Sequence, residues 1–353
     1  METAQHESGA EQAPPGRGRI PRPVRLGIGV AAALAMLAGL VVSGIEQRSS
    51  AATGYQAVLG ERQLRIMAPA NPGGGWDQTS RAVQTALGDV IGRSEVYNVG
   101  GAGGTIGLPQ FVRHAGEPNE LMVTGSIMVG AILTNGSESS LEDVDMLARL
   151  TTEYLAVVVP ADSEIETMEQ LGEAMAADVG AVSIAGGSAG GVEQVLAGLI
   201  AQDVGADPSE VSYVAHSGGG EALTTILSGR ATAGISGISE IAPYIADGSV
   251  RALAVSSPEA LDIPEGVPTL RDSGIDVELQ NWRGIAAPLG ITDEEHAALV
   301  AMLDEMRATD AWQQILADRG WGDAYLTGDE LERFVDDEQA TTAEVLEQIG
   351  LVG

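Results

Sequence analysis

The chain has 353 residues and contains no cysteine and no lysine, so that all of its 18 basic residues are arginines. Without cysteine there can be no disulfide, thiol nucleophile, iron–sulfur cluster or thiolate zinc site. Without lysine there can be no lysine-containing phosphate loop, pyridoxal-phosphate Schiff base or lysine nucleophile. Aromatic residues make up only 3% of the chain. The hydrophobic core must therefore be built mainly from Ala, Val, Leu and Ile.

Basic charge is also scarce, because 50 acidic residues outnumber the arginines and leave a formal net charge of -32. This excess argues against nucleic acid as a partner, since the phosphate backbone would be repelled. The 44% content of hydrophobic residues nevertheless predicts a globular chain. Its length exceeds the roughly 100–200 residues of one typical domain, so we expect two.

The first 52 residues have the composition of a targeting segment. Arg17, Arg19, Arg22 and Arg25 precede residues 26–45, an uncharged stretch rich in Ala, Leu and Val. This order is typical of an export signal, and about 20 apolar residues also suffice to span a bilayer as a helix. The arginines would keep the N-terminus cytoplasmic. We predict that residues 1–52 are a cytoplasmic tail plus a signal peptide or membrane anchor. The remainder would then be extracytoplasmic, either secreted or anchored to the cell membrane by residues 26–45.

Beyond this segment, short apolar runs alternate with amphipathic stretches of helical periodicity. The runs predicted as strands are 63–68, 95–99, 120–124, 155–160, 181–185, 211–215, 231–236 and 251–256. Strands that alternate with helices predict an α/β fold of mostly parallel sheets flanked by helices. The last 60 or so residues are typical of helices; Thr292 and Asp293 are suitable N-caps for the first of them, and Gly320 ends the second.

Four glycine-rich segments lie where a predicted strand passes into a predicted helix: 71–77, 100–107, 186–191 and 216–220. Glycine lets the backbone approach a ligand closely, and the free N–H groups at a helix N-terminus favour an anion. In open α/β sheets, ligands bind beyond the carboxyl ends of the strands, where all four segments would lie. The sequence therefore predicts an anion site that needs no basic side chain.

Two of these segments also resemble catalytic or cofactor motifs. Residues 101–107 miss the G-x-G-x-x-G dinucleotide pattern by one position, because Ile106 stands where the third glycine should be. Residues 186–190 match G-x-S-x-G and would make Ser188 a hydrolase nucleophile. The triad order requires a later acid and histidine, and His216 follows only 28 positions after Ser188. A serine hydrolase of an α/β type stays as the alternative function, and a membrane-linked sensor domain is a third class.

Six segments in order resemble one known family: 68–87, 96–112, 211–237, 247–257, 267–279 and 281–291. Together they are similar to the extracytoplasmic solute-binding receptor of the tripartite tricarboxylate transporter family. The resemblance implies a two-lobed periplasmic-binding-protein-like fold (type II). Two stretches are expected to cross between the lobes, one near 150–160 and one in 257–280, which is interrupted by Pro and Gly. Lobe 1 would then be formed by 53–157 and 271–353 and lobe 2 by 158–270. It also implies capture of a citrate-like tricarboxylate or related carboxylate in the interlobe cleft and delivery to membrane permease subunits, without catalysis, cofactor or metal.

In that family the ligand is held largely by backbone amides and waters of loops that face the cleft. Carried over to this sequence, the resemblance implies a binding site made of Pro72, Gly73, Gly74, Asp77, Gly101, Ala102, Gly103, Gly104, Ser126, Gly186, Gly187, Ser188, Ser217, Gly218, Gly219, Ser236 and Arg283.

Three of the conspicuous side chains have structural interpretations as well. Asp77 could cap the helix that begins near it and pair with Arg81 four residues later. Trp282 is as well explained by packing at the hinge as by ligand contact. Arg283 is the best single candidate for a direct contact between a cation and a ligand carboxylate.

Overall fold

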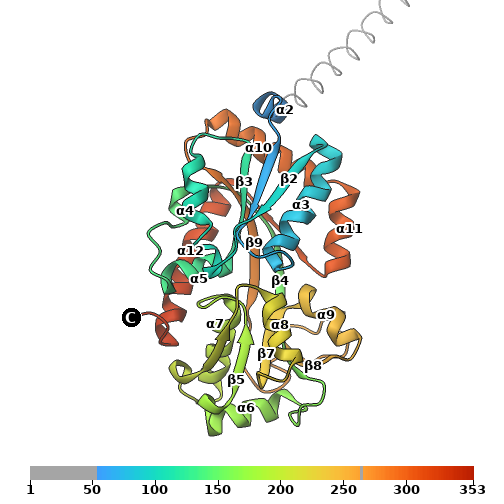
Figure 1. The fold of residues 1–353 in the computed structure, drawn as a ribbon, viewed down its shortest axis with the longest axis vertical. Helices are drawn as coiled ribbons and strands as arrows, with labels where there is room; N and C mark the ends of the chain where they lie inside the picture. The colour runs from blue at the N-terminus through green and yellow to red at the C-terminus, as the bar shows by residue number, and fades with distance from the viewer. Residues whose placement is uncertain (1–53, 263–264) are drawn as a thin grey trace, which may run out of the picture. The chain divides into compact units, whose positions relative to one another are not determined.

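The computed structural model describes residues 54–262 and 265–353, and the long strand β4 (Val144–Pro160) runs through the middle of this part of the chain (Figure 1). Residues Val144 to Tyr154 pair with β9, whereas Leu155 to Pro160 pair with β7 and β8. Through β4, two half-sheets join into one ten-stranded sheet. The predicted targeting segment, residues 1–52, lies outside the described residues. Among the helices that are described, none has the length and apolarity needed to cross a membrane.

The first half-sheet combines parallel and antiparallel pairs. β1 is parallel to β2 and β3, whereas β9 is antiparallel to β3 and β4, and β10 is antiparallel to β4. Its strands besides β4 are β1 (Leu64–Ala68), β2 (Ser94–Asn98), β3 (Glu120–Gly125), β9 (Gln280–Pro288) and β10 (Gly322–Leu326). The α-helices connected to it are α2 (Gly54–Leu59), α3 (Gly75–Ile91), α4 (Leu108–Phe111), α5 (Ser126–Thr134), α10 (Asp293–Arg307), α11 (Asp310–Arg319) and α12 (Gly328–Gln348). Short 3₁₀ helices are η1 (Ala102–Gly104), η2 (Val112–His114) and η3 (Leu141–Asp143).

The second half-sheet is built in the same way from parallel outer strands and an antiparallel centre. β5 is parallel to β6 and β7, and β4 is antiparallel to β7 and β8. The strands are β5 (Ser183–Gly186), β6 (Ser212–Ala215), β7 (Ala233–Gly237) and β8 (Val250–Val255). The helices are α6 (Met168–Ala177), α7 (Val192–Asp203), α8 (Gly219–Leu227) and α9 (Ile238–Ala246), with η4 (Val179–Ala181) and η5 (Pro208–Glu210).

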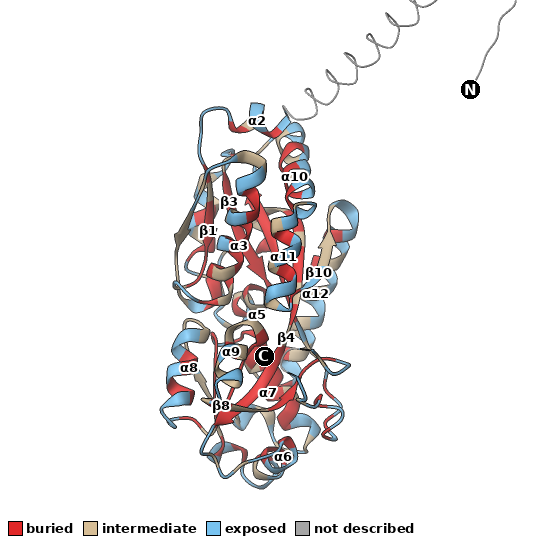
Figure 2. Cartoon of the chain, turned by 90° about the vertical axis from the view of Figure 1, so that its right-hand side faces the viewer, coloured by how far each residue is buried: buried red, intermediate tan, exposed pale blue. Residues whose placement is uncertain are grey.

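The aliphatic composition explains how these sheets are buried. Leu155, Val157 and Val159 pack into one core of the second half-sheet, and Ala156 and Val158 pack into another. Successive residues of a strand point to opposite faces, so the apolar run at the end of β4 is buried on both. A separate core covers the first half-sheet. Figure 2 shows the buried residues concentrated along the central strands, with exposed residues on the outer sides of the helices.

The chain passes from one half-sheet to the other at two places that lie close together. Tyr154 pairs with Gln280 in the first half-sheet, whereas the next residue, Leu155, pairs with Gly237 in the second. On the return path, Leu279 N donates to Ser256 O just before β9 begins. The lobe boundaries predicted near 157 and 270 stay predictions, because residues 54–353 form one compact unit.

Two segments assigned to lobe 1 from the sequence pack against the second half-sheet instead. Ile275 and Val277, in the predicted lobe 1 segment from 271, belong to a core of the second half-sheet. Leu346 and Ile349, near the end of α12, pack against Val195 of α7. The apolar side chains of these segments are buried against residues of the second half-sheet that are distant in the sequence. The Pro and Gly content, from which the boundary was predicted, does not reveal such contacts.

All eight predicted strand segments overlap strands β1 to β8. The predicted caps are also confirmed: Thr292 forms a capping box with Glu295 at the start of α10, and Gly320 ends α11 in the left-handed conformation. Strands β9 and β10 were not predicted, and neither was the first part of β4, residues 144–154.

Candidate functional site

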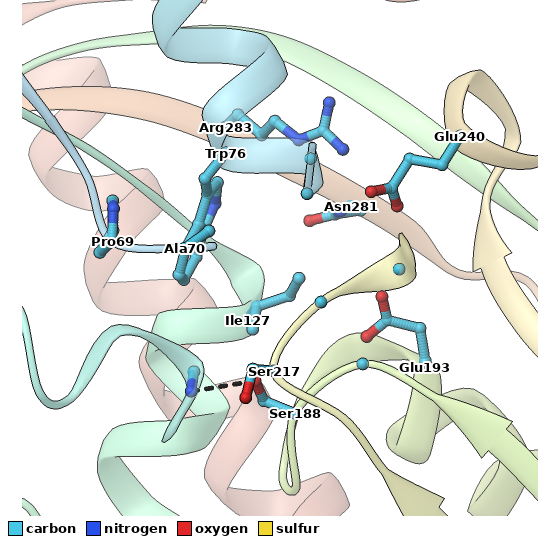
Figure 3. Close-up of a pocket in the computed structure, with 16 residues that line it drawn as sticks. Pro69, Ala70, Trp76, Ile127, Ser188, Glu193, Ser217, Glu240, Asn281 and Arg283 are labelled. Carbon is cyan, nitrogen blue, oxygen red and sulfur yellow. Dashed lines mark hydrogen bonds between the residues drawn. The ribbon is translucent and has the colours of Figure 1, made fainter. Parts of the chain in front are cut away.

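One pocket receives residues from all four predicted glycine segments (Figure 3). The residues that line it are Pro69, Ala70, Gly74, Gly75, Trp76, Gly103, Ile127, Gly187, Ser188, Glu193, Ser217, Gly218, Gly219, Glu240, Asn281 and Arg283. Each of the four segments follows the carboxyl end of a parallel strand, β1, β2, β5 or β6. The predicted convergence of these loops is therefore present in the structure. Both half-sheets contribute to the lining.

The first loop leads from β1 into α3. Gly74 is the N-cap residue of α3, and Gly75 is the first helical residue. The N–H groups of a first helical turn have no acceptor within the helix. Both glycines line the pocket, so the N-terminal end of a 17-residue helix faces it. The fourth loop repeats this arrangement, because Gly218 is the N-cap residue of α8 and Gly219 is its first residue.

Asp77 lies behind this first loop and is not part of the pocket lining. Only 4% of its surface is exposed. Its carboxylate accepts hydrogen bonds from Gly73 N, from Asn98 Nδ2 at 2.9 Å each, and from Arg81. Burial by itself would raise the pKa of Asp77, but the hydrogen bonds from Arg81, Gly73 and Asn98 outweigh it, and the pKa is lowered. The predicted pairing of Asp77 with Arg81 is confirmed, but the N-cap residue of α3 is Gly74. Asp77 also links the first loop to β2 through Gly73 and Asn98.

The second loop contains the one non-glycine residue with positive φ in the described part of the chain, Ala102 at 50°. Such a conformation costs energy for a residue with a Cβ atom. It brings the next residue, Gly103, to the second half-sheet, where Gly103 N donates to Ser188 Oγ at 3.0 Å. A Cβ atom on Gly103 would collide with Cβ of Ala131. The Gly103 amide is therefore occupied by protein rather than free for a ligand.

A buried ionic cluster lies against the start of α3 and contributes Arg283 to the pocket lining. Arg283 Nη2 lies 2.5 Å from Glu153 Oε2, and the side chains are only 2% and 1% exposed. Glu153 also accepts from Ser239 N at the start of α9. Trp321 lies beneath the guanidinium, with its ring centre 5.1 Å from Arg283 Cζ. The predicted cation of the site is present, but its charge is already matched by Glu153.

Two further carboxyl groups, Glu193 and Glu240, come from the first turns of α7 and α9 and point into the pocket (Figure 3). Burial raises the pKa of Glu193 to about 7. Burial and the nearby charge of Glu153 raise the pKa of Glu240 to about 8. Both groups can therefore hold a proton near neutral pH.

The glycines of the loops make room for these charged side chains. A Cβ atom on Gly75 would lie 2.6 Å from Arg283 Nη2, and one on Gly187 would lie 3.0 Å from the carboxylate oxygens of Glu193. A Cβ atom on Gly219 would lie 2.8 Å from the carboxyl carbon of Glu240. Glycine was expected to let the backbone lie close to a ligand. At these positions the backbone lies close to charged side chains of the protein itself.

Several buried polar atoms of the lining lack a hydrogen-bond partner among the described residues. They are Trp76 Nε1, Glu193 Oε2, Glu240 Oε1, Asn281 Oδ1, Arg283 Nε and Arg283 Nη1. Buried polar groups in proteins are nearly always satisfied, because an unpaired one costs free energy. A set of orphaned donors and acceptors around one pocket suits a polar ligand or bound water.

The structure brings together eight of the residues predicted from the sequence and leaves out the others. Those in the lining are Gly74, Gly103, Gly187, Ser188, Ser217, Gly218, Gly219 and Arg283. Those outside it are Pro72, Gly73, Asp77, Gly101, Ala102, Gly104, Ser126, Gly186 and Ser236. Two serines among these have structural partners: Ser126 Oγ accepts from Trp282 N at 3.0 Å, and Ser236 Oγ lies 3.4 Å from Glu240 Oε2.

The residues that sequence reasoning missed are Pro69, Ala70, Gly75, Trp76, Ile127, Glu193, Glu240 and Asn281. Glu193 and Glu240 could have been found, because each lies a few residues beyond a glycine segment or strand end, in the first turn of the following helix. Asn281 is adjacent to Trp282 and Arg283, which were considered. Trp282 itself packs away from the pocket: its Nε1 donates to Glu338 Oε2 at 2.8 Å, and its ring meets Phe334 edge-on.

The geometry does not support Ser188 as a hydrolase nucleophile. Its Oγ accepts from Gly103 N. The ring nitrogens of His216 contact Gly186 O at 3.1 Å and Thr225 Oγ1 at 2.8 Å. A triad requires the histidine to accept the proton of the serine, and His216 is held by other partners.

Elsewhere in the described chain, His114, Glu117 and Glu120 bring three potential metal-ligand atoms within 4.8 Å of one another. Glu120 is already paired with Arg65 at 2.6 Å and accepts from Tyr97 Oη. None of the three lines the pocket, so this cluster adds nothing to the site.

The sequence is similar to a known protein family and to several of its relatives. The family model described as "Tripartite tricarboxylate transporter family receptor" matches residues 79–351. The chain is 26% identical over 229 residues to a UPF0065 protein of Agrobacterium vitis, covering 64% of this chain and 65% of the relative. It is 25% identical over 295 residues to BugT of Bordetella pertussis, covering 82% of this chain and 90% of BugT.

Solved structures share the fold. The periplasmic binding protein BugD superposes with a TM-score of 0.76 at 20% identity, covering 83% of this chain and 99% of BugD. MatC from Rhodopseudomonas palustris with bound malate gives a TM-score of 0.72 at 20% identity, covering 80% of this chain and 98% of MatC. The predicted α/β fold of the periplasmic-binding-protein kind is therefore confirmed.

Proposed function

Because the chain belongs to the tripartite tricarboxylate transporter receptor family, we propose that it is an extracytoplasmic solute-binding protein that captures a carboxylate and delivers it to a tripartite membrane permease. The family predicted from the sequence is confirmed. That family and fold are those of substrate-binding proteins, and we propose that this chain likewise binds its ligand without chemical conversion.

The observation that carries this proposal is the set of orphaned polar atoms in a pocket where helix N-termini meet. Gly75 and Gly219 are the first residues of α3 and α8, and Glu193 lies in the first turn of α7. Helix N-termini favour an anion. Arg283 Nε and Nη1 and Trp76 Nε1 add unpaired donors to the same space. A carboxylate satisfies such donors.

We propose a tricarboxylate such as citrate, or a related carboxylate, as the ligand. MatC, which shares the fold, is described with bound malate. In this conformation the pocket is a cavity of only about 40 Å³, which is room for only a few waters. Two contacts join the half-sheets across it, Asn71 Nδ2 to Glu221 Oε1 and Gly103 N to Ser188 Oγ. Ligand entry therefore requires these contacts to separate. We propose a hinge of β4 and β9 between lobe 1 (53–157 and 271–353) and lobe 2 (158–270), with the segments around Ile275 and Leu346 staying packed on the second half-sheet.

A thermal-shift panel of organic acids on the full chain tests the proposal. A ligand at 100 times its dissociation constant stabilises the folded state by about 2.7 kcal/mol, which raises Tm by several degrees in a chain of this size. We expect di- and tricarboxylates to raise Tm, and monocarboxylates and sugars to do so less. A panel without any carboxylate response would overturn the proposed function.

Two glycines of α8 give a matched pair of variants for the same panel. A Cβ atom on Gly219 meets the Glu240 carboxyl group, whereas one on the adjacent Gly220 meets nothing within 4 Å. We expect Gly219→Ala to reduce the carboxylate-induced shift and Gly220→Ala to retain it. Equal carboxylate-induced Tm shifts in the two variants would mean that the ligand binds at another place.

A further inference from the structure

Glu193 and Glu240 are in an unusual position for a site that binds an anion. Both carboxyl groups point into the pocket from the second half-sheet (Figure 3). Glu193 is 4% exposed, and its Oε2 has no hydrogen-bond partner among the described residues; the same holds for Glu240 Oε1. These two oxygens are therefore available to hydrogen-bond with a ligand.

No basic side chain of the pocket is left to neutralise these acids. Arg283 is the one basic residue of the lining in the described chain, and Glu153 is paired with it. Arg319 lies beyond Trp321, with its guanidinium 5.0 Å from the ring centre. Tyr213, which lies near Glu193, donates its hydroxyl to Gly187 O. The His216 ring is held by Gly186 O and Thr225.

The charge balance then decides the protonation state. A doubly ionised dicarboxylate beside two ionised glutamates would place four negative charges around one already paired arginine. Like charges in a water-poor site repel strongly, because the effective dielectric is low. A carboxylate can be held there only if the two glutamates are neutral, and a neutral carboxylic acid has an O–H group to donate.

We propose that Glu193 and Glu240 are ligand-binding residues that enter the complex as neutral carboxylic acids and donate O–H hydrogen bonds to carboxylate oxygens of the ligand. This inference rests on the proposed function, because it is the anionic ligand that requires the protons. The protons come from solvent when the pocket closes, so the protein takes up an anion together with up to two protons.

The environment of the two groups supports this assignment. Burial raises the pKa of Glu193 to about 7, with Arg283 opposing and Glu153 adding to the effect. Burial, Glu153 and Glu193 raise the pKa of Glu240 to about 8, against Arg283 and Ser236. The N-termini of α7 and α9 favour the ionised forms. An anionic ligand acts in the opposite direction and would raise both values further.

The proposal makes ligand affinity depend on pH in a defined direction. Above the pKa values of the ligand-free protein, each proton must be supplied from solvent, and affinity falls as pH rises. With one proton taken up the fall is 10-fold per pH unit, and with two it is 100-fold.

The test is calorimetric titration of the full chain with L-malate between pH 6.5 and pH 9.5. Both carboxyl groups of malate stay ionised in this range, so any proton uptake belongs to the protein. We expect the affinity to fall at least 10-fold between pH 7.5 and pH 9.5. Titrations at pH 8 in two buffers of different ionisation enthalpy should show net proton uptake. A flat pH profile with no proton uptake would overturn the inference while leaving the proposed function intact, whereas absence of carboxylate binding at every pH would overturn both.

Variants identify the groups responsible. Glutamine donates an N–H bond without titrating, so in the double variant Glu193→Gln, Glu240→Gln we expect the alkaline fall in affinity to shrink to less than 2-fold and the proton uptake to disappear. The exposed Glu173 of α6 serves as the control, and Glu173→Gln should keep the wild-type profile. Loss of malate binding at all pH values in a folded double variant would contradict the proposal, because the amide N–H groups of glutamine should replace the proposed O–H donors. The proton count on the wild-type chain decides the question even if the double variant does not fold.

Discussion

Arg283 and Glu153 form a buried ion pair next to the point where β4 crosses from one half-sheet to the other. Arg283 lies on β9, whose partners are strands of the first half-sheet, and Glu153 lies on β4 just before the crossing. The second carboxylate oxygen of Glu153 accepts from Ser239 N at the start of α9, in the second half-sheet. The only basic residue that lines the pocket in the described chain is thus paired next to the crossing between the half-sheets.

Breaking this pair should destabilise the fold strongly. We expect Glu153→Ala or Arg283→Ala to lower the free energy of unfolding by about 3–5 kcal/mol, because either change leaves a buried charge uncompensated. The double variant Glu153→Ala, Arg283→Ala should lose clearly less free energy of unfolding than the sum of the losses in the two single variants. Denaturant unfolding of the three variants measures this coupling.

The exposed pair Arg307–Asp323, at 2.8 Å with side chains 45% and 34% exposed, is the control. Asp323→Ala should cost no more than about 1 kcal/mol. Additive effects at Arg283 and Glu153, or costs as small as that of the control, would contradict the described pairing.

Asp77 should make stability sensitive to acid. Its pKa is lowered, so its ionised form contributes stability that is fully present above the pKa of an unfolded Asp, about 3.9, and is lost as pH falls through the lower folded value. We expect Asp77→Asn to lower the free energy of unfolding at pH 7 by about 2 kcal/mol. The difference from wild type should shrink as pH approaches 3, measured by urea unfolding at several pH values. A constant difference across this range would show that the charge of Asp77 is not what matters.

Ser188 should show no nucleophilic activity. Because its Oγ accepts from Gly103 N and His216 is held by other partners, we expect neither labelling by a phosphonofluoridate-type serine probe nor hydrolysis of simple esters. Ser188→Ala should instead weaken carboxylate binding, because it removes a contact between the half-sheets. Ester hydrolysis that disappears in Ser188→Ala would revive the hydrolase alternative.

Binding of a carboxylate should tighten as salt rises from very low ionic strength. The ligand and the chain, with its net charge of -32, repel each other over long distances. The Debye length falls from roughly 30 Å at 0.01 M salt to roughly 8 Å at 0.15 M, so distant carboxylates are screened while short-range contacts in the pocket are less affected. We expect a faster on-rate with little change in off-rate. The opposite salt dependence, abolished by Arg283→Gln, would mean that the guanidinium is the main anchor.

Local patterns in the sequence predicted much of the fold. Apolar runs such as 155–160 and caps such as Thr292 and Gly320 depend on neighbouring residues, and the structure confirms them. β9 was missed as a strand because its apolar part is interrupted by Arg283 and Gly284. Arg283 is tolerated there only because Glu153, from a distant part of the chain, neutralises it.

The meeting of the four glycine segments could be predicted for a similar reason. Glycine segments after strands could be recognised, and residues from all four line the pocket. Their detailed role differs from the expectation: Gly103 donates its amide to Ser188, and Gly219 makes room for Glu240. Glu193 and Glu240 lie in helical first turns, where an acidic residue is ordinary. Only the three-dimensional arrangement shows that Glu193 is buried and Glu240 half-buried against the loops.

The central claim is that this pocket holds an intact carboxylate, and equilibrium dialysis of the full chain against a ¹³C-labelled dicarboxylate tests it most directly. Wild type and two α3 variants are compared: a Cβ atom on Gly75 would lie 2.6 Å from Arg283 Nη2, whereas one on Gly88 meets nothing within 4 Å. We predict that wild type and Gly88→Ala retain one ligand per chain, that Gly75→Ala retains much less, and that NMR of the ligand released by denaturation shows it chemically unchanged. No retention by wild type, equal retention by Gly75→Ala, or recovery of a converted product would contradict the account.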